Sequence, residues 1–330
     1  MKVAVLGAGA IGAYVGAALH RGGAEVHLVA RGAHLAALRA NGVRVLSERG
    51  DFAAHPHATG DPAEIGPVDY VFLGLKAHQY AGCGELLRPL LADHTAVIAA
   101  QNGIPWWYFH GLSGHRLEGR SLQSVDPDGA VSRVIPVRRA IGCVVYCSTE
   151  IESPGVIRHL EGTRFSIGEP DGSISPRCSA FSEAMTAGGL KCPVEGALRD
   201  DIWIKLMGNI AFNPLSALAR ATMVQIATHS GTRGLVATMM EETLEIAQAA
   251  GSKPEISIEK RLNGAERVGH HKTSMLQDLE AGKELECDAI IGAAVEIADL
   301  TGVRAPTLRS LHAAVDLLAH TTTTAATARR

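Results

Sequence analysis

A glycine-rich turn near the start of the chain constrains the fold more than any other feature. Gly7, Gly9 and Gly12 follow the β-branched run Lys2–Leu6 and open a stretch rich in Ala, Val and Leu that reaches Leu19. This order predicts a strand, a tight turn and a helix. Glycine at these places allows the turn, a close approach of the backbone to a pyrophosphate, and packing of the helix on the strand. With the exposed N–H groups of the helix start, they predict a dinucleotide site.

Beyond this turn the N-terminal half alternates between strand and helix patterns. Gly22 and Gly23 end the first helix, and the next strand is expected at Glu25–Val29. Further strand patterns occupy residues 70–75, 95–99, 140–146 and 164–167, and helical spacing marks residues 35–41 and 81–91. Such alternation is typical of an α/β domain with a doubly wound, Rossmann-type parallel sheet. The polar, glycine-rich residues 105–139 predict no element.

The end of the second expected strand indicates which dinucleotide is bound. An NAD-binding domain normally places Asp or Glu there, whereas this chain reads Val29-Ala30-Arg31. A guanidinium pairs bidentately with the 2′-phosphate of NADPH, and a carboxylate would repel that phosphate. Arg31 therefore points to NADPH as the cofactor. An ordinary exposed arginine at a strand end is the alternative.

The second half of the chain has a different pattern. Residues 198–218, 224–251, 255–268 and 287–302 show helical spacing, and strand alternation nearly disappears after Pro193. We therefore expect three parts, namely an NADPH-binding Rossmann domain at residues 1–195, an all-helical substrate and catalytic domain at residues 196–320, and a disordered tail at residues 321–330. The substrate cleft is expected between the two domains, beyond the carboxyl ends of the strands.

Composition narrows the class of protein. The chain has 330 residues, enough for roughly two domains of about 150 residues, and a formal net charge of -3 without a basic run that would follow nucleic acid. No stretch approaches the ~18 apolar residues of a membrane span, and no targeting sequence precedes the first strand. The six cysteines are scattered without a C-x-x-C pair, as is typical of reduced thiols. We expect a soluble, cytoplasmic α/β enzyme.

A polar stripe crosses the first helix expected in the second half. Lys205, Asn209 and Asn213 stand at positions i, i+4 and i+8 of an otherwise apolar run, so they share one face. Burying an ammonium and two amides without partners is costly, so this face meets solvent or a polar ligand. A solvated helix would favour Glu and Lys over paired Asn, whose helix propensity is modest. The stripe therefore indicates a ligand-lined cleft.

Further polar residues follow this helix. Ser274 and Glu286 are candidates for hydrogen bonds to a substrate, although each by itself equally fits a structural role, as an N-cap and as an acid favoured by a helix dipole. The histidine pairs at residues 55 and 57 and at residues 270 and 271 lack Cys or acidic partners at ligand spacing. We therefore expect no metal site.

Five groups of residues carry a resemblance to a known family. They are the turn at residues 7–12, Leu75-Lys76-Ala77, Gln101-Asn102-Gly103, the stripe from Lys205 to Asn213, and Ser274-Met275-Leu276-Gln277-Asp278 followed by Glu286. With them the chain resembles the ketopantoate reductase (2-dehydropantoate 2-reductase) family over both expected domains, with gaps around residues 105–139. The resemblance implies NADPH-dependent reduction of ketopantoate to (R)-pantoate, a step toward pantothenate and coenzyme A.

The resemblance also implies a role for each site residue. Lys205 would be the general acid, and Glu286 would orient Lys205 and the substrate. Asn209 and Asn213 would hold the hydroxyl end of the substrate, and Ser274 and Asn102 its carboxylate. The implied cofactor-binding residues are Gly7, Gly9, Ala10, Ile11, Gly12, Arg31, Lys76 and Asn102. An ammonium suits the reaction, because it protonates the alkoxide that develops as hydride reaches C2 of the keto acid.

The chain departs from the family pattern directly after Gly103. Residues 104–110 read Ile-Pro-Trp-Trp-Tyr-Phe-His, an aromatic insertion beside an expected substrate contact. An insertion of this kind fits a lid, a larger acyl pocket, a subunit interface or the local packing of a long loop. It leaves the identity of the keto acid open.

Three functions compete for this sequence. The first is the NADPH-dependent ketopantoate reductase, and the second is a related NADPH-dependent reductase of another 2-keto or 3-hydroxy acid. The third is a non-catalytic NADPH sensor, against which Lys205 argues, because a sensor needs no proton donor. The expected partner is a small keto acid, and a homodimer through the helical domain is a further expectation.

Overall fold

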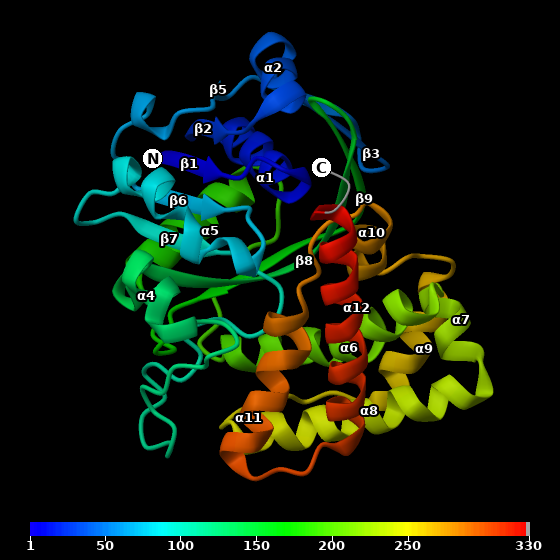
Figure 1. The fold of residues 1–330 in the computed structure, drawn as a ribbon. Helices are drawn as coiled ribbons and strands as arrows, with labels where there is room; N and C mark the ends of the chain where they lie inside the picture. Colours follow the sequence, from blue (N-terminus) through cyan, green and yellow to red (C-terminus); the bar gives the residue numbers. More distant parts are fainter. Residues whose placement is uncertain (328–330) are drawn as a thin grey trace. The chain divides into compact units, whose positions relative to one another are not determined.

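The computed structural model describes residues 1–327, without the side chains of residues 268 and 323–327. Internal contacts divide the chain into two compact units, each made of two segments (Figure 1). Unit 1 comprises Met1–Gln101 and Gly129–Leu198, and unit 2 comprises Asn102–Asp128 and Arg199–Arg330. This division differs from the expected one, after residue 195, chiefly in residues 102–128, whose contacts group them with the helices of the second half.

Unit 1 is built on one sheet of nine strands in the described part of the chain. The strands are β1 (Lys2–Leu6), β2 (Glu25–Val29), β3 (Val43–Ser47), β4 (Phe52–Ala54), β5 (His57–Thr59), β6 (Tyr70–Leu73), β7 (Ala96–Ala99), β8 (Ala140–Ser153) and β9 (Val156–Gly168). They lie in the order β4-β3-β9-β8-β7-β6-β1-β2-β5. Neighbouring strands are parallel throughout the series β8-β7-β6-β1-β2-β5, and β3 is parallel to β9. Strand β8 is antiparallel to β9, and β3 is antiparallel to β4. The predicted Rossmann-type parallel sheet is confirmed.

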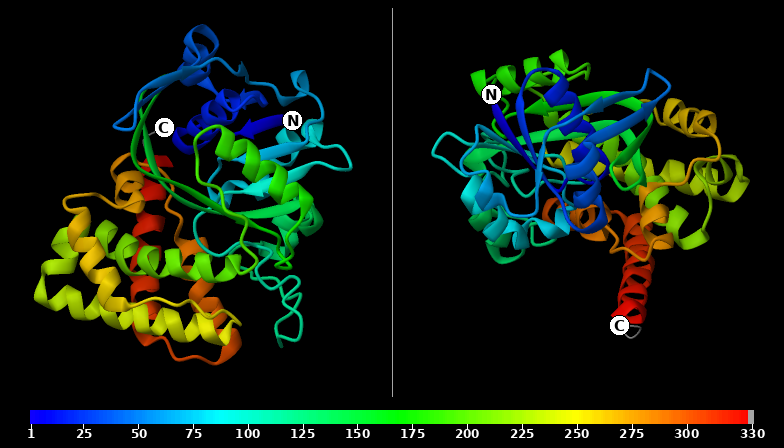
Figure 2. Two further views of the ribbon diagram at one scale, coloured as in Figure 1. Left: turned by 180° about the vertical axis from the view of Figure 1, so that it is seen from behind. Right: turned by 90° about the horizontal axis from the view of Figure 1, so that it is seen from above.

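Short helices pack on this sheet. They are α1 (Ala10–Arg21), α2 (Gly32–Asn41), α3 (Gly84–Leu87), α4 (Ala130–Val134) and α5 (Pro176–Ala187). Helices α1 and α5 lie side by side (Figure 2), and a Cβ on Gly188 would come within 2.2 Å of the Ala18 carbonyl oxygen. Between this pair and the sheet lies an apolar core that includes Val5, Leu28 and Phe181. Small residues at positions 18 and 188 therefore allow α1 and α5 to approach closely.

Unit 1 differs from the expectation in three places. The strands expected at residues 140–146 and 164–167 are longer, because they pair with each other as an antiparallel hairpin. The helix expected at residues 81–91 shrinks to α3 between single 3-10 turns, since Pro89 has no N–H for a continuous helix. Strands β3, β4 and β5 have no counterpart in the expectation. Strands β4 and β5 have only three residues each, and runs this short carry little alternation.

Unit 2 is helical outside its first segment. Its helices are α6 (Leu198–Ala219), α7 (Met223–Thr228), α8 (Ser230–Ala249), α9 (Ile258–Val268), α10 (Ser274–Glu280), α11 (Ala293–Thr301) and α12 (Pro306–Thr327), with a π-helical turn at Asp288–Gly292 before α11. Helix α8 contacts α7, α9, α11 and α12. The predicted all-helical second half is confirmed. No described helix has both the length and the apolar character needed to cross a membrane.

Two helical segments differ from the expectation. Residues 224–251 form two helices, because the chain turns at His229, whose ring accepts a hydrogen bond from the Thr232 N–H and caps α8. The tail expected to be disordered from residue 321 continues α12 through Thr327, and residues 328–330 lie outside the described part. Burial of Leu308 and Val315 anchors the first turns of α12, and helix propagation past an anchored turn costs little.

Candidate active site

The expected dinucleotide-binding residues of unit 1 lie at one edge of its sheet. Gly7, Arg31 and Lys76 follow the carboxyl ends of β1, β2 and β6, which are parallel neighbours. The N–H groups of Gly7 and Ala8 donate to the Val29 carbonyl oxygen at 3.3 and 2.9 Å. These bonds tie the glycine-rich turn to the end of β2, two residues before Arg31.

Each of the three glycines of the turn, at positions 7, 9 and 12, has its own reason to lack a side chain. Gly7 has a φ of 92°, which other residues rarely adopt. A Cβ on Gly12 would lie 2.2 Å from the Gly7 carbonyl oxygen, so only glycine allows α1 to begin this close to the turn. A Cβ on Gly9 would meet nothing within 4 Å. Packing therefore does not require glycine at residue 9, whereas close approach of a pyrophosphate would.

Positive and hydrogen-bonding groups surround this turn. Ala10 and Ile11 are the first residues of α1, where N–H groups without helical partners favour an anion. Arg31 is exposed at the N-terminus of α2, and Lys76 is half-buried just after β6. Free N–H groups at a helix start, with two cations that follow neighbouring strands, would suit a dinucleotide that carries an additional phosphate.

In unit 2 the structure brings three expected site residues into hydrogen-bond contact. The Nζ of Lys205 donates to Oδ1 of Asn102 at 2.7 Å, and Nδ2 of Asn102 donates to Oε2 of Glu286 at 3.4 Å. Lys205 and Asn102 are half-buried, and Glu286 is 6% exposed. An ammonium, an amide and a carboxylate are thus linked in a partly desolvated place. Such an ammonium can donate a proton to an oxyanion that forms beside it.

A tight backbone junction holds Asn102 near Glu286. The next residue, Gly103, has a φ of 85°, and a Cβ there would lie 2.0 Å from the Ala289 carbonyl oxygen. The N–H of Ile104 donates to that same oxygen at 2.8 Å. Ala289 follows Glu286 by about one helical turn, so this junction sets the spacing between the amide and the carboxylate.

Helix α6 carries the rest of the predicted polar stripe. Asn209 and Asn213 follow Lys205 at helical spacing on the same face. Asn213 is 5% exposed, and its Nδ2 finds no hydrogen-bond acceptor among the described residues. A buried donor left without an acceptor is destabilising, so this amide is suited to a ligand oxygen.

Ser274 has no hydrogen bond to this cluster among the described residues. It is exposed at the start of α10, and the N-cap is its neighbour Thr273, whose hydroxyl accepts from the Leu276 N–H at 3.2 Å. Among the described residues we find no hydrogen bond from Ser274 to Asn102 or Lys205. The N-cap interpretation of Ser274 is therefore wrong by one residue, and its contact with substrate stays a prediction.

The aromatic insertion lies inside unit 2. Trp106 is 4% exposed, Trp107 is 2% exposed, and Tyr108 and Phe109 are completely buried. A lid or a subunit interface would leave these rings exposed in a single chain. The structure therefore favours local packing over a lid or an interface.

A second cation, which the sequence analysis missed, contacts α6 from α9. The Nη2 of Arg261 donates to the Ile204 carbonyl oxygen at 2.6 Å and lies over Gly208, where a Cβ would come within 3.1 Å of it. Gly208 directly precedes Asn209 and follows Lys205 by three positions. The available signal was this glycine, because a glycine inside a strong helical pattern usually has a packing reason.

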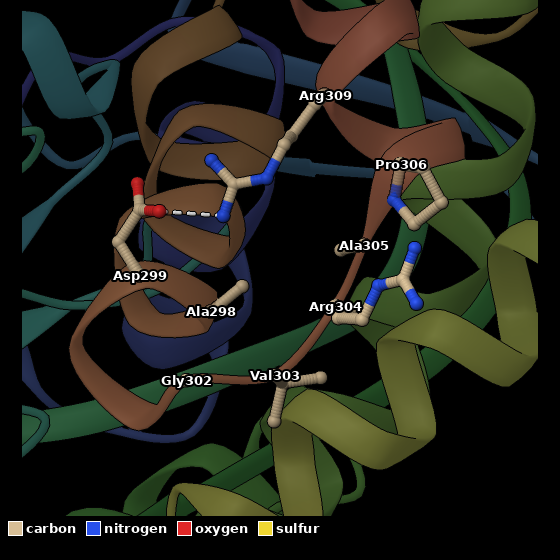
Figure 3. Close-up of a pocket in the computed structure, with 8 residues that line it drawn as sticks. All are labelled: Ala298, Asp299, Gly302, Val303, Arg304, Ala305, Pro306 and Arg309. Atoms are coloured by element: carbon tan, nitrogen blue, oxygen red, sulfur yellow. Dashed lines mark hydrogen bonds and ion pairs between the residues drawn. The ribbon is translucent and has the colours of Figure 1, made fainter.

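Other candidate sites in the described residues do not match the expected chemistry. No three His, Cys, Asp or Glu side chains there are grouped as metal ligands. One pocket of about 270 Å³ lies between the end of α11 and the start of α12 (Figure 3). Of the two arginines that line it, Arg309 pairs with Asp299 at 2.5 Å, and none of the expected site residues lines it.

Fold and site together define an oxidoreductase with a Rossmann-type unit and a helical unit. The ketopantoate reductase PanE/ApbA model matches residues 3–113, and the model of the C-terminal part of the same family matches residues 197–319. A 2-dehydropantoate 2-reductase of Mesorhizobium japonicum is 46% identical over 97% of this chain and 98% of its own. The chain belongs to the ketopantoate reductase PanE/ApbA family.

Solved structures agree with this assignment. The 2-dehydropantoate 2-reductase from Geobacter metallireducens GS-15 superposes with a TM-score of 0.85, at 29% identity over 96% of this chain and 100% of that one. A D-mandelate dehydrogenase solved with NADH and anilino(oxo)acetate shares the fold, with a TM-score of 0.80 at 20% identity over 98% of this chain and 99% of that one. The family resemblance expected from the motifs is confirmed.

Proposed function

We propose that this protein reduces 2-dehydropantoate (ketopantoate) to (R)-pantoate with NADPH, as a step of pantothenate biosynthesis. The observation that carries the proposal is the 2.7 Å hydrogen bond between Lys205 Nζ and Asn102 Oδ1, with Glu286 on the other side of the amide. The 46% identity over 97% of the chain to a protein named 2-dehydropantoate 2-reductase supports this substrate. The arrangement also gives a reductase what a dinucleotide-binding sensor lacks, namely a proton donor.

NADPH, when bound, supplies the hydride that reduces the carbonyl carbon. The N–H groups around Gly9, Ala10 and Ile11 bind the pyrophosphate, because the helix start favours an anion and no side chain blocks Gly9. Arg31 pairs with the 2′-phosphate, and its exposed guanidinium at the end of β2 supports this role. Lys76 lines the cofactor beside the same turn, where Gly74 already touches Gly7 closely.

The substrate is held by side chains of unit 2. Asn102 and Ser274 bind its carboxylate, and Asn209 and Asn213 bind its hydroxyl end. The unpartnered, buried Nδ2 of Asn213 supports this role, since a substrate oxygen would satisfy it. Asn102 also contacts the cofactor in this proposal. The positions of these amides on α6 and beside it favour a short polar substrate over an apolar one.

Lys205 acts as the general acid. Its ammonium donates a proton to the oxygen that gains charge as the carbonyl carbon is reduced, and solvent then restores the proton. Asn102 accepts from the ammonium and directs it, while Glu286 holds the amide in the required orientation. A partly buried ammonium interacts more strongly with a developing oxyanion than one in water does.

The proposal also places the protein in the cytoplasm and includes a homodimer. All six cysteines are free, and five of them are buried, which suits a cytoplasm that keeps thiols reduced. A homodimer through the helical unit stays a prediction, which light scattering of the purified protein tests.

The test is NADPH oxidation, followed at 340 nm, with ketopantoate and with a panel of 2-keto acids that includes aromatic ones. Ketopantoate should give the highest kcat/KM, and chiral analysis of the product should give the R enantiomer. A higher kcat/KM for another 2-keto acid would replace the substrate but keep the chemistry. Tight NADPH binding without oxidation by any of the panel would contradict catalysis and support the sensor.

A further inference from the structure

The aromatic insertion and the site residue Asn102 belong to one continuous segment, residues 102–110, which we call the strap. At one end of the strap, Gly103 and Ile104 meet the Ala289 carbonyl oxygen near Glu286. At the other end, Trp107 and Tyr108 contact α6, the helix that carries Lys205, through Arg199 and Trp203. The strap therefore touches the two segments on which the partners of Asn102 stand.

The hydroxyl of Tyr108 makes the central contact of the strap. It accepts a hydrogen bond from Nε1 of Trp203 at 2.6 Å and donates to the Ala250 carbonyl oxygen at 3.3 Å. Tyr108 is completely buried and Trp203 is 1% exposed, and the two rings stand edge to face with centroids 6.1 Å apart. Burial raises the pKa of the Tyr108 phenol, so the hydroxyl stays protonated and keeps both bonds.

Arg199 fixes the same end of the strap from the first turn of α6. Its Nε donates to the Tyr108 carbonyl oxygen at 2.8 Å, and its Nη2 donates to the His110 carbonyl oxygen at 2.7 Å. The guanidinium carbon also lies 5.6 Å from the centre of the Tyr108 ring. The backbone and the ring of Tyr108 thus contact Arg199 of α6, and its hydroxyl bonds to Trp203 of α6 and to Ala250, which follows α8.

We propose that Tyr108 is a positioning residue, which sets the distance between Asn102 and Lys205 through the strap. Trp203 precedes Lys205 by two positions on α6, so the bond to its indole fixes the strap next to the turn that holds the ammonium. The Ala289 junction fixes the other end of the strap directly after Asn102. The strap therefore links the position of Asn102 to the turn of α6 that carries Lys205. This inference rests on the proposed function, because it concerns the group that donates the proton.

The charges around Lys205 determine how a shift of Asn102 would be detected. Asn102 bonds to both Glu286 and the ammonium, Asp201 precedes Lys205 by one turn on α6, and Arg261 lies over Gly208. A hydrogen bond to the charged form of an amine raises its pKa. Loss of the Asn102 acceptor therefore lowers the pKa of Lys205, while the other charges stay in place.

The experiment compares Tyr108→Phe with the double variant Tyr108→Phe/Trp203→Phe. The single variant leaves the buried Trp203 N–H without its acceptor, whereas the double variant removes both partners and recovers part of the lost stability. Tyr70→Phe is the matched control, because the Tyr70 hydroxyl donates to the Arg177 carbonyl oxygen at 2.9 Å in unit 1. All three variants are the full chain, and melting temperature is measured for each.

Two readouts are used. The first is the pH profile of kcat/KM for the keto acid, in which both Tyr108 variants should lose about tenfold at the optimum and have their alkaline limb at lower pH. The second is the rate of acetylation of Lys205 by acetic anhydride at several pH values, located by peptide mass spectrometry without substrate. It should give a lower amine pKa in both Tyr108 variants and no change in Tyr70→Phe.

The outcomes separate the two proposals. If the double variant is stable but keeps the wild-type amine titration and pH profile, the strap serves stability only and Tyr108 is not a positioning residue. The wild type could fail to oxidise NADPH with any of the 2-keto acids tested, while the titration of the Lys205 amine still shifts in both Tyr108 variants. The proposed function would then fail, and the positioning of Lys205 by Tyr108 would stand. The same shift in Tyr70→Phe would overturn the inference, since a nonspecific loss of a buried bond would then explain it.

Discussion

Lys205 and Asn102 are hydrogen-bonded to each other at 2.7 Å although they are 103 positions apart in the chain. The two residues belong to different segments of unit 2, one to α6 and the other to the strap. The bond holds an ammonium, half-buried, in a defined direction before any substrate is present. Catalysis benefits from groups that need no rearrangement at the moment of reaction.

Replacing Lys205 with Ala should lower kcat by about 10²-fold or more, the usual scale for the loss of a general acid. The dissociation constant for NADPH should stay near the wild-type value, because the nucleotide turn lies in unit 1. Stopped-flow hydride transfer and fluorescence titration measure the two effects. The exposed Lys283 provides the control variant Lys283→Ala. Turnover that survives the loss of Lys205 would remove it from the mechanism.

Replacing Arg31 with Ala should weaken NADPH binding far more than NADH binding. The guanidinium pairs only with the 2′-phosphate, and a charge-assisted bidentate pair contributes about 1.5–3 kcal/mol. Isothermal titration with both dinucleotides gives the ratio, and Arg44→Ala on β3 is an exposed control. Equal losses for the two dinucleotides would refute the phosphate assignment.

Two alanine substitutions in the glycine-rich turn should affect different properties, one the stability of unit 1 and the other the binding of the dinucleotide. Gly12→Ala should destabilise unit 1, because its Cβ would lie 2.2 Å from the Gly7 carbonyl oxygen. Gly9→Ala should leave the melting temperature unchanged, because its Cβ would meet nothing within 4 Å, yet it should weaken dinucleotide binding by at least about tenfold by filling the pyrophosphate position. Thermal unfolding with and without NADPH separates the two. Normal binding by Gly9→Ala would place the pyrophosphate elsewhere.

Replacing Asn213 with Leu should stabilise the protein and impair it as an enzyme. The buried Nδ2 has no acceptor among the described residues, so removing it relieves a penalty of about 1–3 kcal/mol. The same change removes a donor for the substrate and should raise KM for ketopantoate. Chemical denaturation and steady-state kinetics measure the two quantities. A loss of stability would show that the amide is already satisfied without substrate.

Glu169 should make the stability of unit 1 depend on pH in the acidic range. Burial by itself raises the pKa of this carboxyl, but hydrogen bonds from Arg177 at 2.5 Å and Ser175 at 2.5 Å outweigh burial and lower it. A carboxyl whose folded pKa is depressed stabilises the fold above its unfolded pKa, near 4.5, and loses that contribution as the pH falls further.

Glu169→Gln should therefore lose about 2 kcal/mol of the free energy of unfolding at pH 7 and show a flatter dependence on pH below about 4.5. Urea denaturation at a series of pH values measures both effects. The exposed ion pair of Glu85 with Arg88 offers the control Glu85→Gln, which should change little. Parallel pH profiles for wild type and Glu169→Gln would show that this carboxyl does not contribute.

The sequence was sufficient where the signal is local. The turn from Gly7 to Gly12, the strands Lys2–Leu6 and Glu25–Val29 and the apolar spacing of α6 follow from neighbouring residues, and all match the structure. Strands β8 and β9 extend well beyond the segments expected at residues 140–146 and 164–167, because most of their length depends on pairing between the two strands. Strand β5 was missed because its three residues are too few to show strand alternation.

The site divides in the same way. The residue types and the polar stripe on α6 could be predicted from the sequence, because helical periodicity places Lys205, Asn209 and Asn213 on one face of any helix. Three features could not be predicted, because each depends on which distant segment packs against α6. They are the bond from Lys205 to Asn102, the unpartnered Nδ2 of Asn213 and the position of Arg261 over Gly208.

The sequence by itself determined the dinucleotide turn, the alternation of strands and helices and the choice of chemical groups, because these depend on covalent geometry and local periodicity. Only the tertiary structure decided that the aromatic residues 106–109 are buried and that residues 102–128 belong with the helices. Burial of large rings is set by the total apolar surface removed from water, and no short stretch of sequence specifies which partner provides that surface.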